Sequence, residues 1–214
     1  MLYDLQRLTT LVDDAKKSSQ KRKFTQAVEL IVNFKGLDMK APENRINETI
    51  GLPHLIGREV KVCIIADGDM VIKARASGAD FIITKAELDE YAHNKKAIKK
   101  LASQYDYFAA RTDMMATVGK TLGSILGPRG KMPDPIPPQA NVEPLVKKYK
   151  NAVRVRLRDQ LAVRCRIGSE DMESKDIAEN IQAVLTTIER KIKLDQYLSS
   201  IMVKTTLGKP VKIR

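Results

Sequence analysis

The sequence contains no tryptophan, two cysteines and two histidines, so the residues that most often build metal sites and nucleophilic active sites are scarce. Cys63 and Cys165 lie in separate apolar runs and belong to no motif of closely spaced cysteines or histidines. We expect two buried, reduced thiols and no metal site, because zinc needs several ligands close together. The two histidines, His54 and His93, suggest no Ser/His/Asp or Cys/His catalytic set.

Long hydrophobic runs are also missing. No apolar stretch approaches the roughly 18 to 20 residues that a membrane-spanning helix needs. The first residues, 1–11, mix Asp4 and Arg7 into their apolar positions, unlike a secretory signal peptide. We therefore expect a cytoplasmic protein without a membrane partner, and we expect it to be monomeric when free.

The phosphate-binding motifs of nucleotide-dependent enzymes are incomplete. Gly119-Lys120-Thr121 resembles the end of a P-loop, but Met114 stands where that motif needs a glycine. Asp67-Gly68-Asp69 lacks the glycine spacing of a dinucleotide site, and its carboxylates would repel a phosphate. These two aspartates suit either a Mg²⁺ ion or a simple turn into a helix. We expect no enzyme activity and no cofactor.

Basic residues, in contrast, are abundant. There are 38 Lys and Arg residues against 26 Asp and Glu residues, a formal net charge of +12. This imbalance predicts a polyanionic partner, although composition alone does not separate RNA from DNA or from an anionic membrane. Hydrophobic residues make up 43% of the chain, enough to build one large or two small packed domains from 214 residues.

Both ends of the chain combine amphipathic helices with strands in which apolar and polar residues alternate. Apolar residues repeat at helical spacing in residues 5–17, and residues 27–34 alternate as expected of a strand with one buried face. Alternation over residues 153–167, interrupted at Asp159-Gln160, predicts a hairpin with an arginine-rich face. Three further elements are expected: a strand at 45–52, a helix at 174–192, and a strand at 199–206 that is followed by a basic tail.

The middle of the chain has a different pattern. Nearly continuous apolar runs at 60–66, 81–83 and 105–110 predict buried strands, and helical stretches alternate with them. This alternation is typical of a parallel sheet with helices on both faces. Residues 127–138, rich in proline and glycine, predict an ordered surface loop, after which Asn141 is expected to cap a helix.

The change of pattern near Gly57 and Ala152 indicates an inserted domain. We therefore predict a discontinuous two-domain α/β protein. Residues 1–58 and 153–214 form an α+β domain with an antiparallel sheet, and residues 59–152 form an inserted Rossmann-like parallel α/β domain. The outer segments together carry 23 basic and 15 acidic residues, whereas the insert carries 15 and 11. The more strongly charged discontinuous domain is expected to hold the polyanion.

The segment from Lys21 to Leu30 combines three cations, one aromatic ring and a carboxylate at the start of a strand. Lys and Arg neutralise phosphates, a ring can stack on a base or ribose, and Glu29 can accept hydrogen bonds from base amino groups. This combination favours an RNA site. A solvated basic loop that leads into an ordinary half-buried strand is the alternative.

Four motifs spread over the chain carry a family resemblance. They are KFTQAVEL at 23–30, LPH at 52–54, GPRGKMP at 127–133 and TTLG at 205–208. In this order they resemble the L-one family of large-subunit ribosomal proteins, over essentially the whole chain. The third motif, with Arg129 and Lys131, is similar to the archaeal branch. The resemblance implies a split rRNA-binding domain with a Rossmann-like insert.

The resemblance also implies a function. It implies a structural constituent of the large ribosomal subunit that binds 23S-type rRNA at the mobile stalk and helps to release deacylated tRNA from the exit site. Many members bind their own mRNA and repress its translation. The RNA-contact positions of the family correspond to Lys23, Phe24, Glu29, Asp159, Ser200, Thr206, Leu207 and Gly208, to which we add Arg158 of the arginine-rich strand.

Some positions keep a second explanation. Arg129 and Lys131 can face a tRNA or can belong to a packed surface loop whose charges are solvated. Instead of contacting RNA, Thr206 can be an ordinary threonine of an edge strand, and Gly208 can be a glycine that a turn requires. Ala27, Gln160, Leu161, Leu207 and Leu55 depart from the family pattern. A free regulatory RNA-binding protein and, behind it, a nucleotide-binding enzyme are the alternatives for the whole chain.

Overall fold

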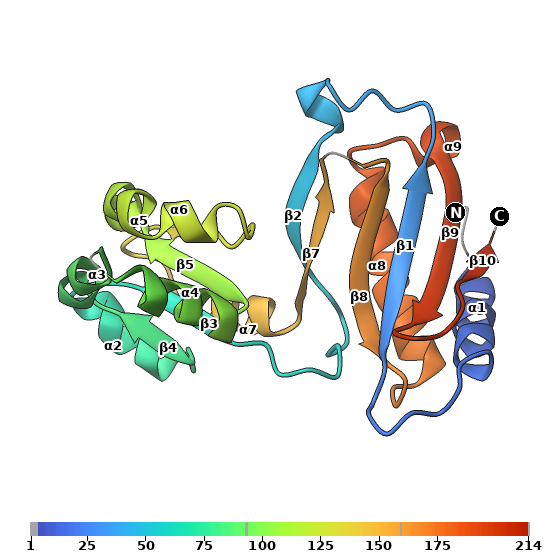
Figure 1. The fold of residues 1–214 in the computed structure, drawn as a ribbon, viewed down its shortest axis with the longest axis horizontal. Helices are drawn as coiled ribbons and strands as arrows, with labels where there is room; N and C mark the ends of the chain where they lie inside the picture. Colours follow the sequence, from blue (N-terminus) through green and yellow to red (C-terminus); the bar gives the residue numbers. More distant parts are fainter. Residues whose placement is uncertain (1–3, 93, 159, 214) are drawn as a thin grey trace. The chain divides into compact units, whose positions relative to one another are not determined.

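The computed structural model describes residues 4–92, 94–158 and 160–213. The chain forms two compact units (Figure 1): the first comprises Met1–Arg58 and Asn151–Arg214, and the second comprises Glu59–Lys150. The first unit thus unites the two ends of the chain. The second unit is inserted between them.

A four-stranded antiparallel sheet forms the centre of the first unit, with the strand order β10-β9-β1-β8 (Figure 1). Val28, Leu30 and Val32 alternate with half-buried neighbours along β1, as predicted, and their side chains contribute to the hydrophobic core. Two amphipathic helices supply the other half of that core. These elements are α1 (Leu5–Lys17), β1 (Ala27–Phe34), β8 (Ala162–Ser169), α8 (Ser174–Glu189), β9 (Leu198–Thr205) and β10 (Val211–Ile213).

The arginine-rich hairpin predicted over residues 153–167 is wrong in its pairing. Of the strands in the described chain, β7 (Ala152–Leu157) pairs with β2 (Ile46–Gly51), while β8 pairs with β1. Alternation predicts that two strands exist but does not specify the partner of each. The predicted basic tail also differs, because part of it forms β10 at the edge of the main sheet. Two short helices, η1 (Pro42–Asn44) and α9 (Leu194–Tyr197), complete the unit.

The second unit contains a parallel sheet with the strand order β4-β3-β5-β6. Its fourth strand, β6, lies within the proline-rich segment that was predicted to be only a loop. Between β4 and β5 the chain forms two separate helices, α3 and α4. The elements are β3 (Val62–Ile65), α2 (Asp69–Ala76), β4 (Phe81–Ile83), α3 (Lys85–Ala92), α4 (Lys95–Gln104), β5 (Tyr107–Arg111), η2 (Thr112–Met114), α5 (Met115–Thr121), α6 (Gly123–Leu126), β6 (Asp134–Ile136) and α7 (Glu143–Lys150).

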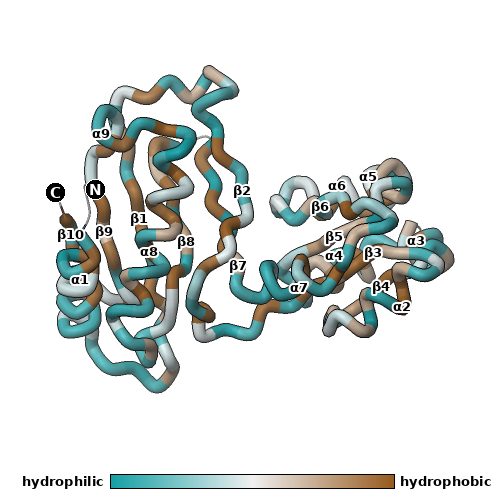
Figure 2. The backbone as a smooth tube through the Cα atoms, turned by 180° about the vertical axis from the view of Figure 1, so that it is seen from behind, coloured by the Kyte–Doolittle hydropathy of each residue, from teal (hydrophilic) through white to brown (hydrophobic). Residues whose placement is uncertain are grey.

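Helices cover both faces of this parallel sheet. On one face, Cys63 and Phe108 join a core with buried residues of α3 to α6, such as Leu88 and Leu101. On the other face lie α2 and α7, which contact β4 and β3 respectively. Figure 2 shows hydrophobic residues along the strands of both units. The predicted fold class is therefore confirmed: an antiparallel sheet built from both ends of the chain and a separate parallel α/β sheet.

Candidate nucleic-acid interface

The first unit leaves one face of its four-stranded sheet uncovered by α1 and α8, which pack on the opposite face (Figure 1). We call it the open face. At its centre, Ile31 of β1 lies between its register partners Arg164 and Met202. Towards the start of β1, Glu29 lies between Arg166 of β8 and Lys204 of β9. The open face thus combines cations with a carboxylate and a small apolar centre.

The guanidinium group of Arg166, a cation of the open face, is partly buried. Its Nη2 is 3.5 Å from the carbonyl of Gly57, and its buried Nε has no hydrogen-bond partner among the described residues. Burial lowers the pKa of the Arg166 guanidinium, repulsion from Arg58 lowers it further, and Glu29 opposes both effects. A buried donor without a partner carries a free-energy cost.

Gln26 joins the basic segment after α1 to the turn after β9. Its side chain is fully buried. Its Nε2 donates to Ser19 Oγ at 2.9 Å, to the Gln20 carbonyl at 3.1 Å and to Glu170 Oε2 at 3.1 Å, while its Oε1 accepts from the Leu207 amide at 3.1 Å. One amide therefore holds together segments that are far apart in the sequence.

Thr206 and Gly208 lie in this same turn. The Ala27 amide donates to Thr206 Oγ1 at 3.0 Å, and the Thr206 amide donates to the Ala27 carbonyl at 3.0 Å. A Cβ atom on Gly208 would lie 2.3 Å from Thr205 Oγ1 and 3.4 Å from Ser19, so the turn has no space for a side chain there. The glycine is required by the fold, and it also leaves the backbone accessible to a ligand.

Two large hydrophobic side chains are exposed on the segments that Gln26 connects. Phe24 is 51% exposed and Leu207 is 58% exposed. Lys21, Arg22 and Lys23, which precede the ring, are exposed as well. An aromatic ring among cations is suited to stacking on a base or ribose while the cations neutralise phosphates. We call the residues 21–24 and 206–208 together the basic edge of the sheet.

The structure does not bring Ser200 to the basic edge. Ser200 of β9 is buried, is the register partner of Asn33 on β1, and accepts a hydrogen bond from Asn33 Nδ2 at 3.0 Å. Thr206 lies six positions further along the chain, just past the end of β9, a distance of about 20 Å. Ser200 lies instead at the end of β1 where the Phe34 amide donates to the Leu161 carbonyl at 2.8 Å. Of the predicted contact residues on β9 and after it, Thr206, Leu207 and Gly208 lie beside the segment 23–27, whereas Ser200 does not.

The remaining predicted RNA-contact residues belong to the loop between β7 and β8. Arg158 is exposed and has interactions within the protein. Asp159 lies outside the described residues. Leu161, one of the departures from the family pattern, is 37% exposed. This loop and Ser200 mark the opposite end of the sheet from the basic edge.

Sequence reasoning missed Gln26, Arg164, Arg166 and Lys204 as parts of the site. The three cations were visible as members of alternating strands, but their common face depends on strand pairing, which the sequence does not specify. Nothing in the sequence indicates that Gln26 is buried, because a glutamine in front of a strand normally lies at the surface.

In the second unit, Arg129 and Lys131 hold the end of α4. Arg129 Nη1 donates to the Lys99 carbonyl at 3.3 Å and to Ser103 Oγ at 3.0 Å. Lys131 Nζ donates to the carbonyls of Ala102 at 3.0 Å and Tyr105 at 2.6 Å. Both cations thus satisfy groups near a helix C-terminus, where positive charge is favourable. Neither is the purely solvated loop charge of the alternative explanation.

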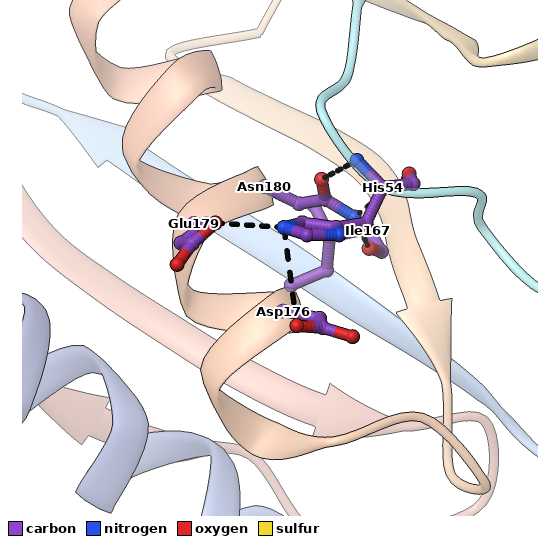
Figure 3. A network of polar contacts seen from close by, with 5 residues as sticks. All are labelled: His54, Ile167, Asp176, Glu179 and Asn180. Atoms are coloured by element: carbon purple, nitrogen blue, oxygen red, sulfur yellow. Dashed lines mark hydrogen bonds and ion pairs between the residues drawn. The ribbon is translucent and has the colours of Figure 1, made fainter.

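His54 fastens the segment after β2 to α8 (Figure 3). Its amide donates to Asn180 Oδ1 at 3.0 Å, and its Nε2 donates to Glu179 Oε2 at 2.7 Å. Asn180 is fully buried and donates in turn to the carbonyls of His54 and Ile167. The hydrogen bond from His54 lowers the pKa of the Glu179 carboxyl group below its ordinary value. This network positions the segment that precedes Gly57 and explains the LPH motif structurally.

Three further features of the described residues bear on whether they form a metal site, a reactive cysteine or a membrane-spanning helix. Within the described ranges, no three His, Cys, Asp or Glu side chains converge as a metal ion would require. Cys63 and Cys165 are buried, and burial raises the pKa of the Cys165 thiol to about 12. No helix of the described chain is both long and apolar enough to span a bilayer.

Comparison with known proteins agrees with this picture. The profile of the ribosomal protein L1p/L10e family matches residues 15–209. The chain is 46% identical over 209 residues to large ribosomal subunit protein uL1 of Methanothermobacter thermautotrophicus, covering 97% of this chain and 99% of that protein. It is 41% identical to uL1 of Archaeoglobus fulgidus over the full length of both chains. For uL1 of Thermofilum pendens the identity is 45%, over 92% of this chain and 87% of the relative. The chain belongs to the ribosomal protein L1p/L10e family.

Proposed function

We propose that the protein is a constituent of the large ribosomal subunit that binds 23S-type rRNA through its first unit. The observation that carries this proposal is the basic edge, where buried Gln26 holds the cationic segment with Phe24 beside the turn of Thr206, Leu207 and Gly208. Membership of a ribosomal protein family supports it independently. On this proposal, the protein is found on ribosomes and is not an enzyme.

Each part of the interface has a distinct task in this proposal. Lys23 and its basic neighbours neutralise phosphates, and Phe24 stacks on or packs against the sugar and base. Glu29 accepts hydrogen bonds from a base amino group in the wide minor groove of the RNA, and Thr206 contacts a ribose hydroxyl. Gly208 allows the RNA backbone to approach closely. Arg166, the register partner of Glu29, adds a positive charge to the open face.

Three finer proposals depend on the family resemblance. The two units act as separate domains, the first for rRNA and the second for tRNA. The protein sits on the mobile stalk, and the second unit, including Arg129, meets deacylated tRNA at the exit site and assists its release. The first unit also binds a structure on the protein's own mRNA that mimics its rRNA site, and it thereby represses translation of that mRNA.

The proposed function is tested by sedimentation of salt-washed ribosomes and by direct binding. We expect the protein to remain with the large subunit, and we expect the purified chain to prefer its rRNA fragment to DNA of the same sequence. Phe24→Ala should weaken rRNA binding, whereas Leu55→Ala, which removes an exposed hydrophobic group elsewhere on the first unit, should not. A protein that binds RNA but never sediments with large subunits would instead be a free regulator.

A further inference from the structure

The solvent face of α4 carries a dense group of cations. Lys95, Lys96, Lys99 and Lys100 are all exposed, and Ile98, Leu101 and Ala102 occupy the buried face of the same helix. None of the four lysines forms an ion pair with another described residue. Arg129 adds a fifth cation, since its guanidinium group is bonded to the Lys99 carbonyl and to Ser103. We call these five residues the α4 basic surface.

This arrangement is electrostatically unfavourable in the isolated protein. Lys95 and Lys96 lie in the first turn of α4, which contains no acidic residue, and the helix dipole disfavours cations at that end. Two lysine pairs, Lys95 with Lys99 and Lys96 with Lys100, are four residues apart, a spacing at which like charges destabilise a helix. The neighbouring helix α3 carries three exposed carboxylates, Glu87, Asp89 and Glu90. Among the described residues, none of them forms an ion pair with the four lysines. An external polyanion would neutralise these lysines and so relieve both their mutual repulsion and their unfavourable interaction with the helix dipole.

The surface is held rigidly enough to act as a binding site. Asn94 caps α4 by accepting from the Ala97 amide at 3.0 Å, and Lys131 binds two carbonyls at the other end of the helix. The loop that carries Arg129 is thereby fixed to the helix. Lys95 and Lys99 are one turn apart, about 6 Å along the axis, so successive cations can follow a phosphate backbone.

We propose that the α4 basic surface is a second RNA-binding site, which holds the phosphate backbone of a folded RNA other than the rRNA bound by the first unit. An anionic membrane fits less well, because the apolar residues of α4 are buried and none remains to insert into lipid. This inference rests on the proposed contact between the second unit and exit-site tRNA and assigns that contact to particular residues. Lys131 then has a positioning role, because it supports the helix and the loop.

The test uses the full-length chain saturated with its rRNA fragment and deacylated tRNA as the probe. One variant replaces Lys95, Lys96, Lys99 and Lys100 with Gln, which preserves helix propensity. The matched control replaces four exposed cations of α2 and α7 with Gln: Lys73, Arg75, Lys147 and Lys148. We expect the α4 variant to bind tRNA roughly tenfold more weakly or worse, with its log–log salt slope reduced by about 3, and the control to change little.

Each outcome bears on the proposal. Unchanged tRNA binding by the α4 variant would overturn it, and so would an equal loss in the control, which would reveal only a general charge effect. Binding to phosphatidylserine vesicles that depends on the α4 lysines, without binding to tRNA, would assign the surface to membranes instead. If the wild-type chain fails to bind rRNA, the proposed function fails, and the same tRNA comparison made with the free full-length chain decides the role of α4.

Discussion

Gln26 and Glu170 are joined by three hydrogen bonds, although they lie in loops more than a hundred residues apart in the sequence. In one of them the Glu170 amide donates to the Gln26 carbonyl at 2.9 Å. The Gln26 backbone amide donates to Glu170 Oε1 at 2.9 Å, and its side-chain amide donates to Glu170 Oε2 at 3.1 Å. The same glutamine binds the Leu207 amide. The shape of the basic edge is therefore set by a contact between two residues of which one, Gln26, is fully buried and cannot itself touch RNA.

Replacing Gln26 with Glu should destabilise the protein at neutral pH by about 1–3 kcal/mol, because two carboxylates then face each other and a donor is lost. Repulsion raises the folded-state pKa of the pair above the unfolded value of about 4.3, so the penalty is present at neutral pH and disappears under acidic conditions. Adding Glu170→Gln should recover part of the loss. Urea unfolding between pH 4 and pH 7 measures both effects, and equal stability of the single variant across this range would contradict the assignment.

Thr206→Val should reduce both the stability of the first unit and its affinity for rRNA. The change removes the acceptor of the Ala27 amide and the hydroxyl proposed to contact ribose, each at about 1–3 kcal/mol. Thr206→Ser keeps the hydroxyl and should retain most of both properties. The exposed Thr10→Val, which also loses a hydroxyl bonded to a backbone carbonyl, is the control. Full rRNA affinity in a stable Thr206→Val protein would remove Thr206 from the interface.

Lys23→Gln should weaken rRNA binding mainly through charge. The dependence of log affinity on log salt concentration should fall by about 0.7 to 0.9, the contribution of one neutralised phosphate. The preference for rRNA over DNA of the same sequence should remain. Lys40→Gln, an equal loss of charge on the loop after β1, should leave the slope unchanged. A loss of RNA preference in Lys23→Gln would mean that the cation itself discriminates between nucleic acids.

The lowered pKa of the Glu179 carboxyl group predicts that the folded protein loses stability in acid. This pKa is lowered in the folded state by the hydrogen bond from His54, so the contribution of Glu179 is fully present above the unfolded pKa of about 4.3 and is lost as the pH falls through the lower folded value. Glu179→Gln should be less stable than the wild type at pH 7, and the difference should shrink towards pH 3. Denaturant unfolding at both pH values tests this, and a constant difference would exclude the linkage.

The first unit alone should retain most of the rRNA affinity. Joining residues 1–58 to 151–214 through a short linker keeps β1, β8 and β9 with the basic edge, and it removes the α4 basic surface. The separate segment 59–150 should bind the rRNA fragment only weakly. Filter binding compares the two pieces, and comparable affinities would reverse the assignment of the rRNA site.

The sequence predicted those parts of the fold that depend on local periodicity. Alternation at Val28, Leu30 and Val32 marked β1, and continuous apolar runs around Ile64 marked the buried parallel sheet. The same signals did not identify strand partners, so the hairpin over 153–167 was wrong. The strand β6 was missed because Pro135 lies within it and prolines normally indicate a loop.

The candidate site was predictable to the extent that it consists of exposed chemistry on recognisable motifs, such as Lys23, Phe24 and Leu207. Its buried support was not. Gln26 is a polar residue whose burial involves partners more than a hundred residues away, Glu170 and Leu207. No local pattern distinguishes Gln26 from a surface residue, because a buried polar group is compatible with the fold only once its distant partners are in place.

The central position of β1 constrains the order of events during synthesis. Its partners β8 and β9 lie well over a hundred residues later in the chain, and the turn that completes the basic edge follows β9. The second unit emerges as one uninterrupted segment and can fold early, whereas β1 must wait for the last quarter of the polypeptide. A nascent chain halted before Gly208 therefore lacks the turn that completes the proposed rRNA site, so binding of rRNA at the basic edge requires translation to have passed this point.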